Sequence, residues 1–478
     1  MKYKFKFQPY EHQLTALKKS WDKEEYALFM DMGTGKSKVL IDNMCILYDQ
    51  GKLDGCLIVA PKGVYRNWEQ GELPTHMPDH VIADIVLWDP SQTTKQINKQ
   101  KKLFQPNSNL KIFVMNVEAF STKKGSEMAD VFLRAVPSMM VIDESTTIKS
   151  KDAKRTKTIV KLGKSAKYRR ILTGSPVTKS PMDLYTQCEF LSEYLLGHQS
   201  YYSFQNDYSI IKRRVLGAHS FNQIVGYKRL DELNEILEKF SYRVRKEDCL
   251  DLPSKVYLKR VVELTKEQRS VYDSLKTFAL ALIEEGSVTP TTVLTQLLRL
   301  QQVCSGHVKL DDGTLKTFPT NKMPELVSVL DEVGGSVIIW ANYTYDIVSI
   351  TKKIASIYGE EAVCSYYGET PSDSRQQIVK DFQDPNNPVR FFVGQPRTGG
   401  YGLTLTQATT VIYYSNSYDL EVRLQSEDRA HRIGQTSKVT YVDIIAENTV
   451  DDKILIALRN KIDIASQVLA ENFRDWII

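Results

Sequence analysis

The first stretch of this chain with residues suited to chemistry is Asp31-Met32-Gly33-Thr34-Gly35-Lys36-Ser37. An apolar run follows at once, so this stretch is predicted to be a loop that opens a helix. Glycines let backbone N–H groups approach phosphate oxygens, and a helix N-terminus adds positive potential. Lys36 can then reach the outer phosphates of a nucleotide, and Ser37 can offer its hydroxyl to Mg²⁺. The stretch predicts a nucleotide-phosphate site; a glycine-rich helix entry that binds no ligand is the alternative interpretation.

Two adjacent carboxylates, Asp143 and Glu144, directly follow the apolar run 139–142. Carboxylates at the end of a buried strand are costly unless they are used. Beside a phosphate loop, one of them can hold Mg²⁺ while the other polarises a water molecule. The alternative is a solvated pair of loop acids.

The stretch from Gln425 to Gln435 contains a pair of arginines. Arg429 and Arg432 are three residues apart and share a helix face. A planar, permanently charged guanidinium suits a dissociating γ-phosphate, whereas the alternative is a surface ion pair. A glycine-rich loop at 397–404 follows a predicted strand, and by itself it is weak evidence for a site.

Apolar runs that alternate with helical patterns position these residues. Strands are expected at 57–62, 111–116, 139–142, 171–173, 336–340, 389–393 and 410–414, and a long amphipathic helix is expected at 451–468. Such alternation predicts parallel sheets with ligands at the carboxyl ends of their strands. The stretch 182–250 is helical in pattern and rich in aromatic residues, and Leu252-Pro253 is interpreted as the linker between two halves.

Composition sets the class of protein without identifying it. The 478 residues include 42% hydrophobic and 25% charged residues, which is typical of a globular protein of two or three domains. The net charge of +5 is compatible with a nucleic-acid partner. The six cysteines are widely spaced and have no Cys-x-x-Cys pair, which disfavours a zinc site and a disulfide framework. No signal peptide and no apolar run long enough to span a bilayer is found, so the chain is expected to be cytosolic.

Over nearly its full length the chain resembles helicase superfamily two, and within it the Swi/Snf-type DNA translocases. The general phosphate-loop pattern has its first glycine at the position of Met30. Residues 31–37 are similar to the first ATP-binding motif of that family, in which this position is not glycine either. Other similar stretches are Gln13, 60–62 with Trp68, 143–149, 172–176, 264–268, 297–307 and the signature 428–435.

The resemblance implies two RecA-like parallel-sheet lobes in tandem, an α/β fold with helical insertions. The first lobe is expected to span 1–250 with an insertion at about 182–250, and the second 251–478 with an insertion at about 262–318. ATP and Mg²⁺ are the implied cofactors, with ATP bound between the lobes. The implied residues fall into five groups: for ATP, Gln13, Met32, Gly33, Thr34, Gly35, Lys36 and Ser37; for Mg²⁺, Ser37 and Asp143; for catalysis, Lys36, Asp143, Glu144, Gln425, Arg429 and Arg432; for DNA, Lys62, Asn116, Asn342, Arg397 and Thr404; for coupling, Thr173, Ser175 and Gly402.

The function that the resemblance implies is a DNA-dependent ATPase that translocates on duplex DNA and remodels DNA or protein–DNA complexes. DNA contacts to phosphates make binding largely independent of sequence, on duplex or branched DNA. A strand-separating or branch-migrating helicase is the alternative, because it shares every motif. A non-catalytic, ATP-gated DNA-binding subunit is a third hypothesis, which the presence of Lys36, Glu144 and both arginines disfavours.

The chain departs from the family pattern at one notable position. Thr146 stands where the Mg²⁺-binding segment usually has histidine, which puts the usual link from hydrolysis to the coupling motif in doubt. The resemblance also indicates a compact enzyme of a phage or bacterium, located in the cytoplasm of a bacterial or phage-infected cell.

Overall fold

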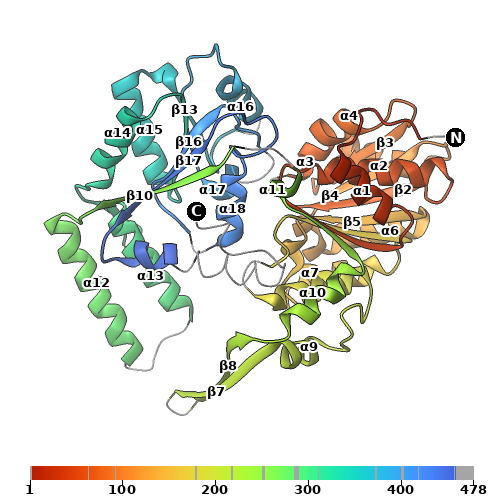
Figure 1. Cartoon of the computed structure of the whole chain (residues 1–478), viewed down its shortest axis with the longest axis horizontal. Coiled ribbons are helices and arrows are strands. Elements are labelled where there is room, and N and C mark those ends of the chain that lie inside the picture. Colours follow the sequence, from red (N-terminus) through yellow and green to blue (C-terminus); the bar gives the residue numbers. More distant parts are fainter. Residues whose placement is uncertain are drawn as a thin grey trace. The chain divides into compact units, whose positions relative to one another are not determined.

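The structure is a computed structural model, and it describes residues 3–62, 64–91, 93–177, 180–216, 219–249, 253–284, 290–310, 312–371, 374–399, 403–417, 419–456 and 458. Contacts divide the chain into two compact units. The N-terminal unit is formed mainly by Met1–Arg214 and Phe221–Asp251, and the C-terminal unit mainly by Leu252–Ile462. Each unit is built around its own parallel sheet (Figure 1). The two α/β units confirm the predicted fold class.

The N-terminal unit contains a seven-stranded sheet in the order β3-β4-β2-β5-β6-β1-β9. Every pairing in it is parallel. Its strands are β1 (Glu25–Met30), β2 (Gly55–Ala60), β3 (Ala83–Leu87), β4 (Leu110–Asn116), β5 (Ser138–Asp143), β6 (Tyr168–Thr173) and β9 (Ser241–Val244). The central strands are apolar on both faces because helices cover both sides of the sheet. In β5, for example, Met140 and Ile142 pack into one core cluster, and Met139 and Val141 into another.

Helices connect these strands and cover the sheet. They are α1 (Glu11–Ser20), α2 (Lys36–Asp49), α3 (Tyr65–Asn67), η1 (Trp68–Glu72), α4 (Leu73–His76), α5 (Thr94–Lys101), η2 (Lys102–Phe104), η3 (Val117–Ser121), α6 (Lys123–Ala135), η4 (Ser145–Ile148) and α7 (Lys154–Gly163). The apolar runs expected at 57–62, 111–116, 139–142 and 171–173 coincide with β2, β4, β5 and β6. The predicted alternation of strands and helices in this unit is therefore confirmed.

The stretch 182–250 is only partly helical, which corrects the expectation of a helical insertion. Its helices are η5 (Pro181–Asp183), α8 (Leu184–Leu191), α9 (Tyr201–Tyr208), α10 (Leu230–Glu238) and α11 (Lys246–Cys249). Between α9 and α10 lie two strands, β7 (Ser209–Leu216) and β8 (His219–Tyr227), which form a sheet of their own. β9 joins the main sheet beside β1. The aromatic side chains of α8 and α9 do form a core, since Tyr185, Phe204 and Tyr208 pack together.

The C-terminal unit contains a six-stranded parallel sheet in the order β10-β17-β16-β13-β15-β14. Its strands are β10 (Lys255–Val262), β13 (Ser336–Trp340), β14 (Val363–Tyr366), β15 (Phe391–Gly394), β16 (Ala408–Tyr413) and β17 (Val439–Ala446). Its helices are α12 (Lys266–Glu284), α13 (Pro290–Cys304), α14 (Lys322–Glu332), α15 (Thr344–Tyr358), η6 (Glu360–Ala362), α16 (Arg375–Gln383), α17 (Pro396–Gly399) and α18 (Leu420–Glu427). Alternate residues of β13 enter two core clusters, Ile339 one and Trp340 the other.

The insertion expected at about 262–318 contains α12 and α13, followed by the short antiparallel pair β11 (His307–Lys309) and β12 (Leu315–Thr317). Residues 450–456 are helical, and the rest of the helix expected at 451–468 lies outside the described residues except for Leu458. Leu252 of the expected linker and Gly402 also lie outside them. Among the described residues, no helix combines the length and apolarity that crossing a membrane requires.

Candidate nucleotide site and nucleic-acid contact residues

The predicted phosphate loop joins the end of β1 to the start of α2. Gly33 and Gly35 adopt positive φ angles of 80° and 92°, a conformation that glycine tolerates and other residues resist. Gly35 is the N-cap of α2, and a Cβ atom at this position would overlap the side-chain amide of Gln13. The loop therefore needs glycine at Gly35 for two reasons, its backbone angle and its contact with α1.

Gln13 holds the loop through its amide. Its Nε2 donates a hydrogen bond to the carbonyl oxygen of Thr34 at 3.0 Å, and its Oε1 accepts one from the backbone N–H of Tyr10 at 3.1 Å. The ring Nε2 of His12 lies 2.8 Å from the same Thr34 oxygen, and the Thr34 hydroxyl donates to the carbonyl of Asp31 at 2.7 Å. A link between the adenine-sensing position and the loop is thus built into the fold, while the contact of Gln13 with adenine stays a prediction.

The Lys36 ammonium lies across the loop. It donates hydrogen bonds to the carbonyl oxygens of Met30 at 2.8 Å and Asp31 at 3.3 Å, and the residue is only 8% exposed. Ser37 is half-buried in the first turn of α2. Both side chains are therefore at the carboxyl end of β1, where the sheet pattern predicts ligands.

Asp143 and Glu144 lie at the carboxyl end of β5 and are both buried, with 8% and 7% of their surface exposed. One Asp143 oxygen accepts a hydrogen bond from Trp68 Nε1 at 2.9 Å, and the other accepts the Glu144 N–H at 3.0 Å. Burial raises the pKa of the Asp143 carboxyl, although the Trp68 hydrogen bond and the charge of Lys36 act to lower it. That influence of Lys36 places the loop ammonium and this carboxylate in one electrostatic site.

Glu144 has a strained backbone, with φ at 49°. This left-handed conformation is uncommon for a residue other than glycine, and such strain is concentrated at functional sites. The residue is the N-cap of η4 and lies where β5 ends. The geometry agrees with a residue that is placed for chemistry rather than for packing.

The predicted coupling residues lie at the end of β6. The Thr173 hydroxyl oxygen accepts a hydrogen bond from the Ser175 N–H at 3.1 Å. A Cβ atom on Gly174 would come within 3.1 Å of the backbone nitrogen of Met32, so this turn packs directly on the phosphate loop. Arg243 ties the two together, because it donates to the Gly174 carbonyl at 3.0 Å and forms an ion pair with Asp31 at 3.0 Å.

A second connection joins Ser145, the residue after Glu144, to the same turn. The hydroxyl of Ser145 donates to Gln187 Oε1 at 2.6 Å, and Gln187 Nε2 donates to the carbonyl of Pro176 at 2.9 Å. Gln187 is fully buried on α8. This chain of hydrogen bonds runs from the segment that contains Thr146 to the coupling turn. The connections made by Gln187, Arg243 and the Trp68 side chain were not predicted, because they join residues far apart in sequence and no local pattern marks them.

The arginine pair of the C-terminal unit is anchored to the glycine-rich loop. Helix α18 ends at Glu427, before both arginines, so the prediction that they share a helix face is wrong. Arg429 is 2% exposed; its Nε donates to the carbonyl of Gln425 at 2.9 Å and its Nη1 to the carbonyl of Leu403 at 3.0 Å. Arg432 is half-buried, and its Nη1 donates to the same Leu403 oxygen at 3.2 Å. Gln425 is buried and donates to Glu421 at 3.1 Å. The hydrogen bonds of Arg429 therefore hold the loop in place, in addition to the catalytic role predicted for this residue. Arg432 is the more accessible of the two arginines.

The candidate DNA-contacting residues lie at or beyond the carboxyl ends of strands in their own units. Lys62 and Arg397 are exposed, and Asn116, Asn342 and Thr404 are half-buried. Asn116 donates to Glu118 at 2.9 Å, and the Asn342 N–H donates to the Ser415 hydroxyl at 2.9 Å. Their contact with DNA stays a prediction.

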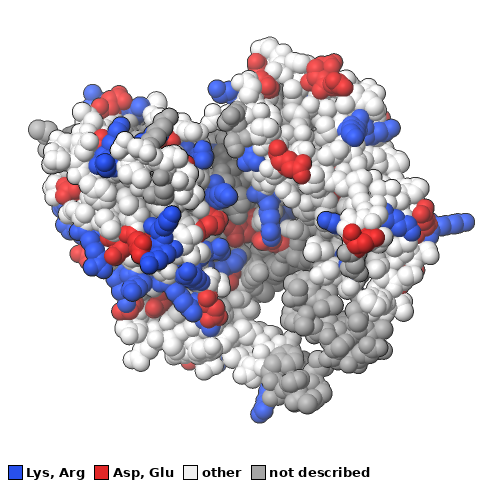
Figure 2. Space-filling model, turned by 180° about the vertical axis from the view of Figure 1, so that it is seen from behind, with Lys and Arg blue, Asp and Glu red and all other residues white. Residues whose placement is uncertain are grey.

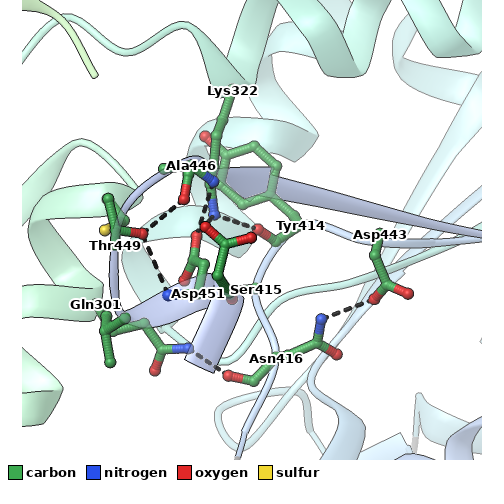
Figure 3. Close-up of polar contacts among 12 residues, drawn as sticks. Gln301, Lys322, Tyr414, Ser415, Asn416, Asp443, Ala446, Thr449 and Asp451 are labelled. Carbon is green, nitrogen blue, oxygen red and sulfur yellow. Dashed lines mark hydrogen bonds and ion pairs between the residues drawn. The ribbon is translucent and has the colours of Figure 1, made fainter. Parts of the chain in front are cut away.

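A cluster of buried polar residues fixes the ends of β16 and β17 in the C-terminal unit (Figure 3). Lys322, with no exposed surface, donates to Asp451 at 2.6 Å and to the carbonyl of Tyr414 at 3.1 Å. Asn416 donates to Asp443 at 2.7 Å, and the Asn416 carbonyl accepts a hydrogen bond from Gln301 of α13. These contacts join the helical insertion to the edge of the sheet that carries Asn342.

The fold and this geometry define a tandem α/β protein with a phosphate-type loop beside a buried acid pair. A model of the SNF2-related domain matches residues 12–308, and a model of the helicase conserved C-terminal domain matches residues 321–434. The chain belongs to the SNF2-related family.

Similar proteins include the putative ATP-dependent helicase/translocase YwqA of Bacillus subtilis, 26% identical over 94% of this chain and 46% of the relative. Snf21, a chromatin structure-remodeling complex subunit of Schizosaccharomyces pombe, is 25% identical over 92% of this chain and 37% of its own length. A solved SWI2/SNF2 ATPase core of Sulfolobus solfataricus in complex with dsDNA covers 100% of this chain and 97% of its own, with 24% identity and a TM-score of 0.44. The chain thus spans less than half the length of these two curated relatives.

Proposed function

We propose that this chain is a DNA-dependent ATPase that translocates on double-stranded DNA and remodels DNA or protein–DNA complexes. The observation that carries the proposal is the buried Asp143–Glu144 pair at the carboxyl end of β5, in the same parallel sheet as β1, whose carboxyl end leads into the phosphate loop with Lys36. The family match and the names of YwqA and Snf21 support the same function.

In the proposed mechanism, residues of both units have distinct roles in binding and hydrolysing the nucleotide. The N–H groups of the loop and the Lys36 ammonium bind the nucleotide phosphates. Glu144, held by its strained backbone, orients the attacking water and takes its proton. Arg429 and Arg432 of the C-terminal unit stabilise charge on the transferred phosphate, a role worth about 10³–10⁵ in turnover for an arginine finger.

The residues also fit Mg²⁺. This ion prefers hard oxygen ligands, and the Ser37 hydroxyl with the Asp143 carboxylate offers them. Within the described part of the chain no ion pair of Asp143 is found, so a cation would compensate the charge of this buried carboxylate. Bound there, the ion would neutralise developing charge on the phosphates.

Coupling to DNA would use the turn after β6. That turn packs on the phosphate loop through Gly174 and connects to the Glu144 segment through Gln187. In this proposal, these direct contacts inside one unit would transmit a change at the phosphates. Lys62, Asn116, Asn342, Arg397 and Thr404 are proposed to contact DNA phosphates, which gives binding that is salt-sensitive and largely independent of sequence.

The test is steady-state ATP hydrolysis with no nucleic acid, with single-stranded DNA, with duplex DNA and with a branched junction. The variant Glu144→Gln serves as the blank. Strong stimulation by plain duplex is expected. Stimulation confined to single strands or junctions would favour the strand-separating or branch-migrating helicase instead. Absence of hydrolysis under all four conditions would favour the non-catalytic, ATP-gated subunit.

A further inference from the structure

The two-stranded ribbon formed by β7 and β8 is a feature that the proposed mechanism does not use. Its strands up to Arg214 and from Phe221 belong to the N-terminal unit. It forms a sheet of its own, separate from the seven-stranded sheet. Figure 1 shows that it extends beyond α9 and α10, which stand at its base. A strand of eight residues such as β7 reaches roughly 25 Å. The ribbon is therefore an arm rather than part of the core.

The base of this arm is firmly attached. Tyr208 and Ser209 are 1% and 3% exposed, and the N–H of Lys228 donates to the Tyr208 carbonyl at 3.1 Å where the ribbon closes. Ile224 of β8 packs against the core cluster of the unit. The charge of Arg229 is compensated at the base, since it contacts Glu232 at 2.6 Å and Asp207 at 3.6 Å. An arm fixed in this way can transmit a load to the unit.

The charges farther along the arm have one sign. Between Asp207 and Asp231 the sequence contains no acidic residue; Lys212, Arg213 and Arg214 lie on β7, and Lys228 and Arg229 follow at the base. Lys212 and Arg213 are both exposed on β7. Successive residues of a strand point to opposite faces, so each face of the ribbon carries a cation.

Such a surface fits a polyanion. Like charges on a narrow ribbon repel one another, and binding to phosphates relieves that repulsion and releases counterions. A two-stranded ribbon is also narrow enough to enter the major groove of a duplex. On the face of the N-terminal unit seen in Figure 2, many Lys and Arg side chains are exposed, with Asp and Glu side chains among them. On α7, Lys154, Lys157 and Lys161 are exposed.

We propose that the β7–β8 ribbon is an arm that binds the phosphate backbone of duplex DNA, apart from the residues proposed above to contact DNA during translocation. The choice of ligand rests on the proposed function. The arm adds affinity that does not depend on nucleotide, and it holds the enzyme on DNA between cycles. RNA or an acidic protein would satisfy the same charges, and the test separates them.

The experiment compares the full chain with Lys212→Ala/Arg213→Ala and with the control Lys101→Ala/Lys102→Ala. The control also removes two adjacent exposed cations from the N-terminal unit, at the end of α5 and the start of η2. Binding of a labelled 40-base-pair duplex without nucleotide is measured between about 50 and 200 mM salt, and competition with duplex RNA and polyglutamate is measured beside it.

We expect the ribbon variant to reduce the slope of log affinity against log salt by about 1.8, because each lost phosphate contact changes it by about 0.9. The control variant is expected to leave that slope unchanged, and ATP hydrolysis without DNA is expected to be equal in all three proteins. Three outcomes would contradict the proposal that the ribbon binds DNA. They are an unchanged slope in the ribbon variant, an absence of duplex binding by the unaltered chain, and a loss of binding only to RNA or polyglutamate. Failure of DNA to stimulate hydrolysis in the unaltered chain would instead overturn the proposed function, because the slope is measured without nucleotide.

Discussion

Two buried carboxylates, one in each unit, meet opposite electrostatic environments. Burial raises the pKa of Asp143 in the N-terminal unit, and the Trp68 hydrogen bond and Lys36 offset that effect only in part. Burial also opposes ionisation of Glu427 in the C-terminal unit, but Lys255 and Arg423 together lower its pKa to about 2. Arg423 contacts Glu427 at 2.8 Å and Asp443 at 2.6 Å, and Lys255 contacts Glu427 at 3.1 Å.

The difference separates a site from a structural cluster. In the Glu427 cluster cations and tyrosine hydroxyls surround the buried acid, and Tyr257 donates to it at 2.8 Å. Such a cluster is complete without a ligand. At Asp143 two neutral N–H donors contact a carboxylate whose neighbour, Glu144, has a strained backbone. A carboxyl with a raised pKa, burial and a strained neighbouring backbone are together typical of a functional site that binds a ligand.

The strongest test of this difference removes one carboxylate of the proposed site. Glu144→Gln preserves the volume of the side chain and removes the proposed base, so DNA-stimulated ATP hydrolysis should fall by about 10²–10⁴-fold. Binding of ATP and DNA should persist, which traps a bound state. Hydrolysis kinetics and nucleotide binding measure the two effects separately, and normal turnover in this variant would rule out Glu144 as the base.

In the C-terminal unit the largest effect should be on stability. Lys322→Met leaves Asp451 buried without its cation, which costs about 3–5 kcal/mol in the free energy of unfolding. The double variant Lys322→Met/Asp451→Asn should recover much of that loss, because it removes the uncompensated charge. Denaturant unfolding of all three proteins forms the cycle. A single variant as stable as the unaltered chain would show that the pair does not hold the ends of β16 and β17 together.

Acid should weaken the Glu427 cluster in a defined pH window. Since the pKa of Glu427 is lowered from 4.5 to about 2, its contribution to stability is fully present above pH 4.5 and is lost as the pH falls toward 2. Linkage makes that contribution on the order of 3 kcal/mol. Unfolding of the C-terminal unit between pH 5 and 2, followed in the unaltered chain and in Glu427→Gln, measures it. An equal loss of stability in both proteins would contradict this account.

Much of the fold could be predicted because its signals are local. The apolar runs of β2, β4 and β5 stand directly before the candidate residues Lys62, Asn116 and Asp143, so the strands and the edge that they share were both visible in the sequence. The ribbon was missed because its strands carry basic residues and because the single turn signal between them, Gly217 in the sequence, is weak in a stretch that otherwise has a helical pattern. β9 was missed because it has only four residues, one of them Arg243.

The contacts that complete the candidate site were beyond prediction for a different reason. Trp68 and Asp143 are 75 residues apart, and Ser145 and Gln187 are 42 apart. Each pair is a tertiary contact between residue types that are common on helices and in loops. The departure at Thr146 pointed to the coupling of hydrolysis but could not indicate that Gln187 connects the two segments.

The smallest expected effect tests whether the environment of Asp143 matters as well as its identity. Trp68→Phe removes the Nε1–H that contacts Asp143 but keeps an aromatic ring in the core. Hydrogen bonds to a metal-binding carboxylate orient it, and their loss usually costs about 10–100-fold in metal affinity. The Mg²⁺ concentration that gives half-maximal hydrolysis should therefore rise by about that factor. Trp88→Phe, in another buried position of the same unit, controls for lost packing. If the Mg²⁺ concentration for half-maximal hydrolysis rises equally in both variants, the hydrogen bond from Trp68 serves only the fold, and it then gives no support to a difference in role between Asp143 and Glu427.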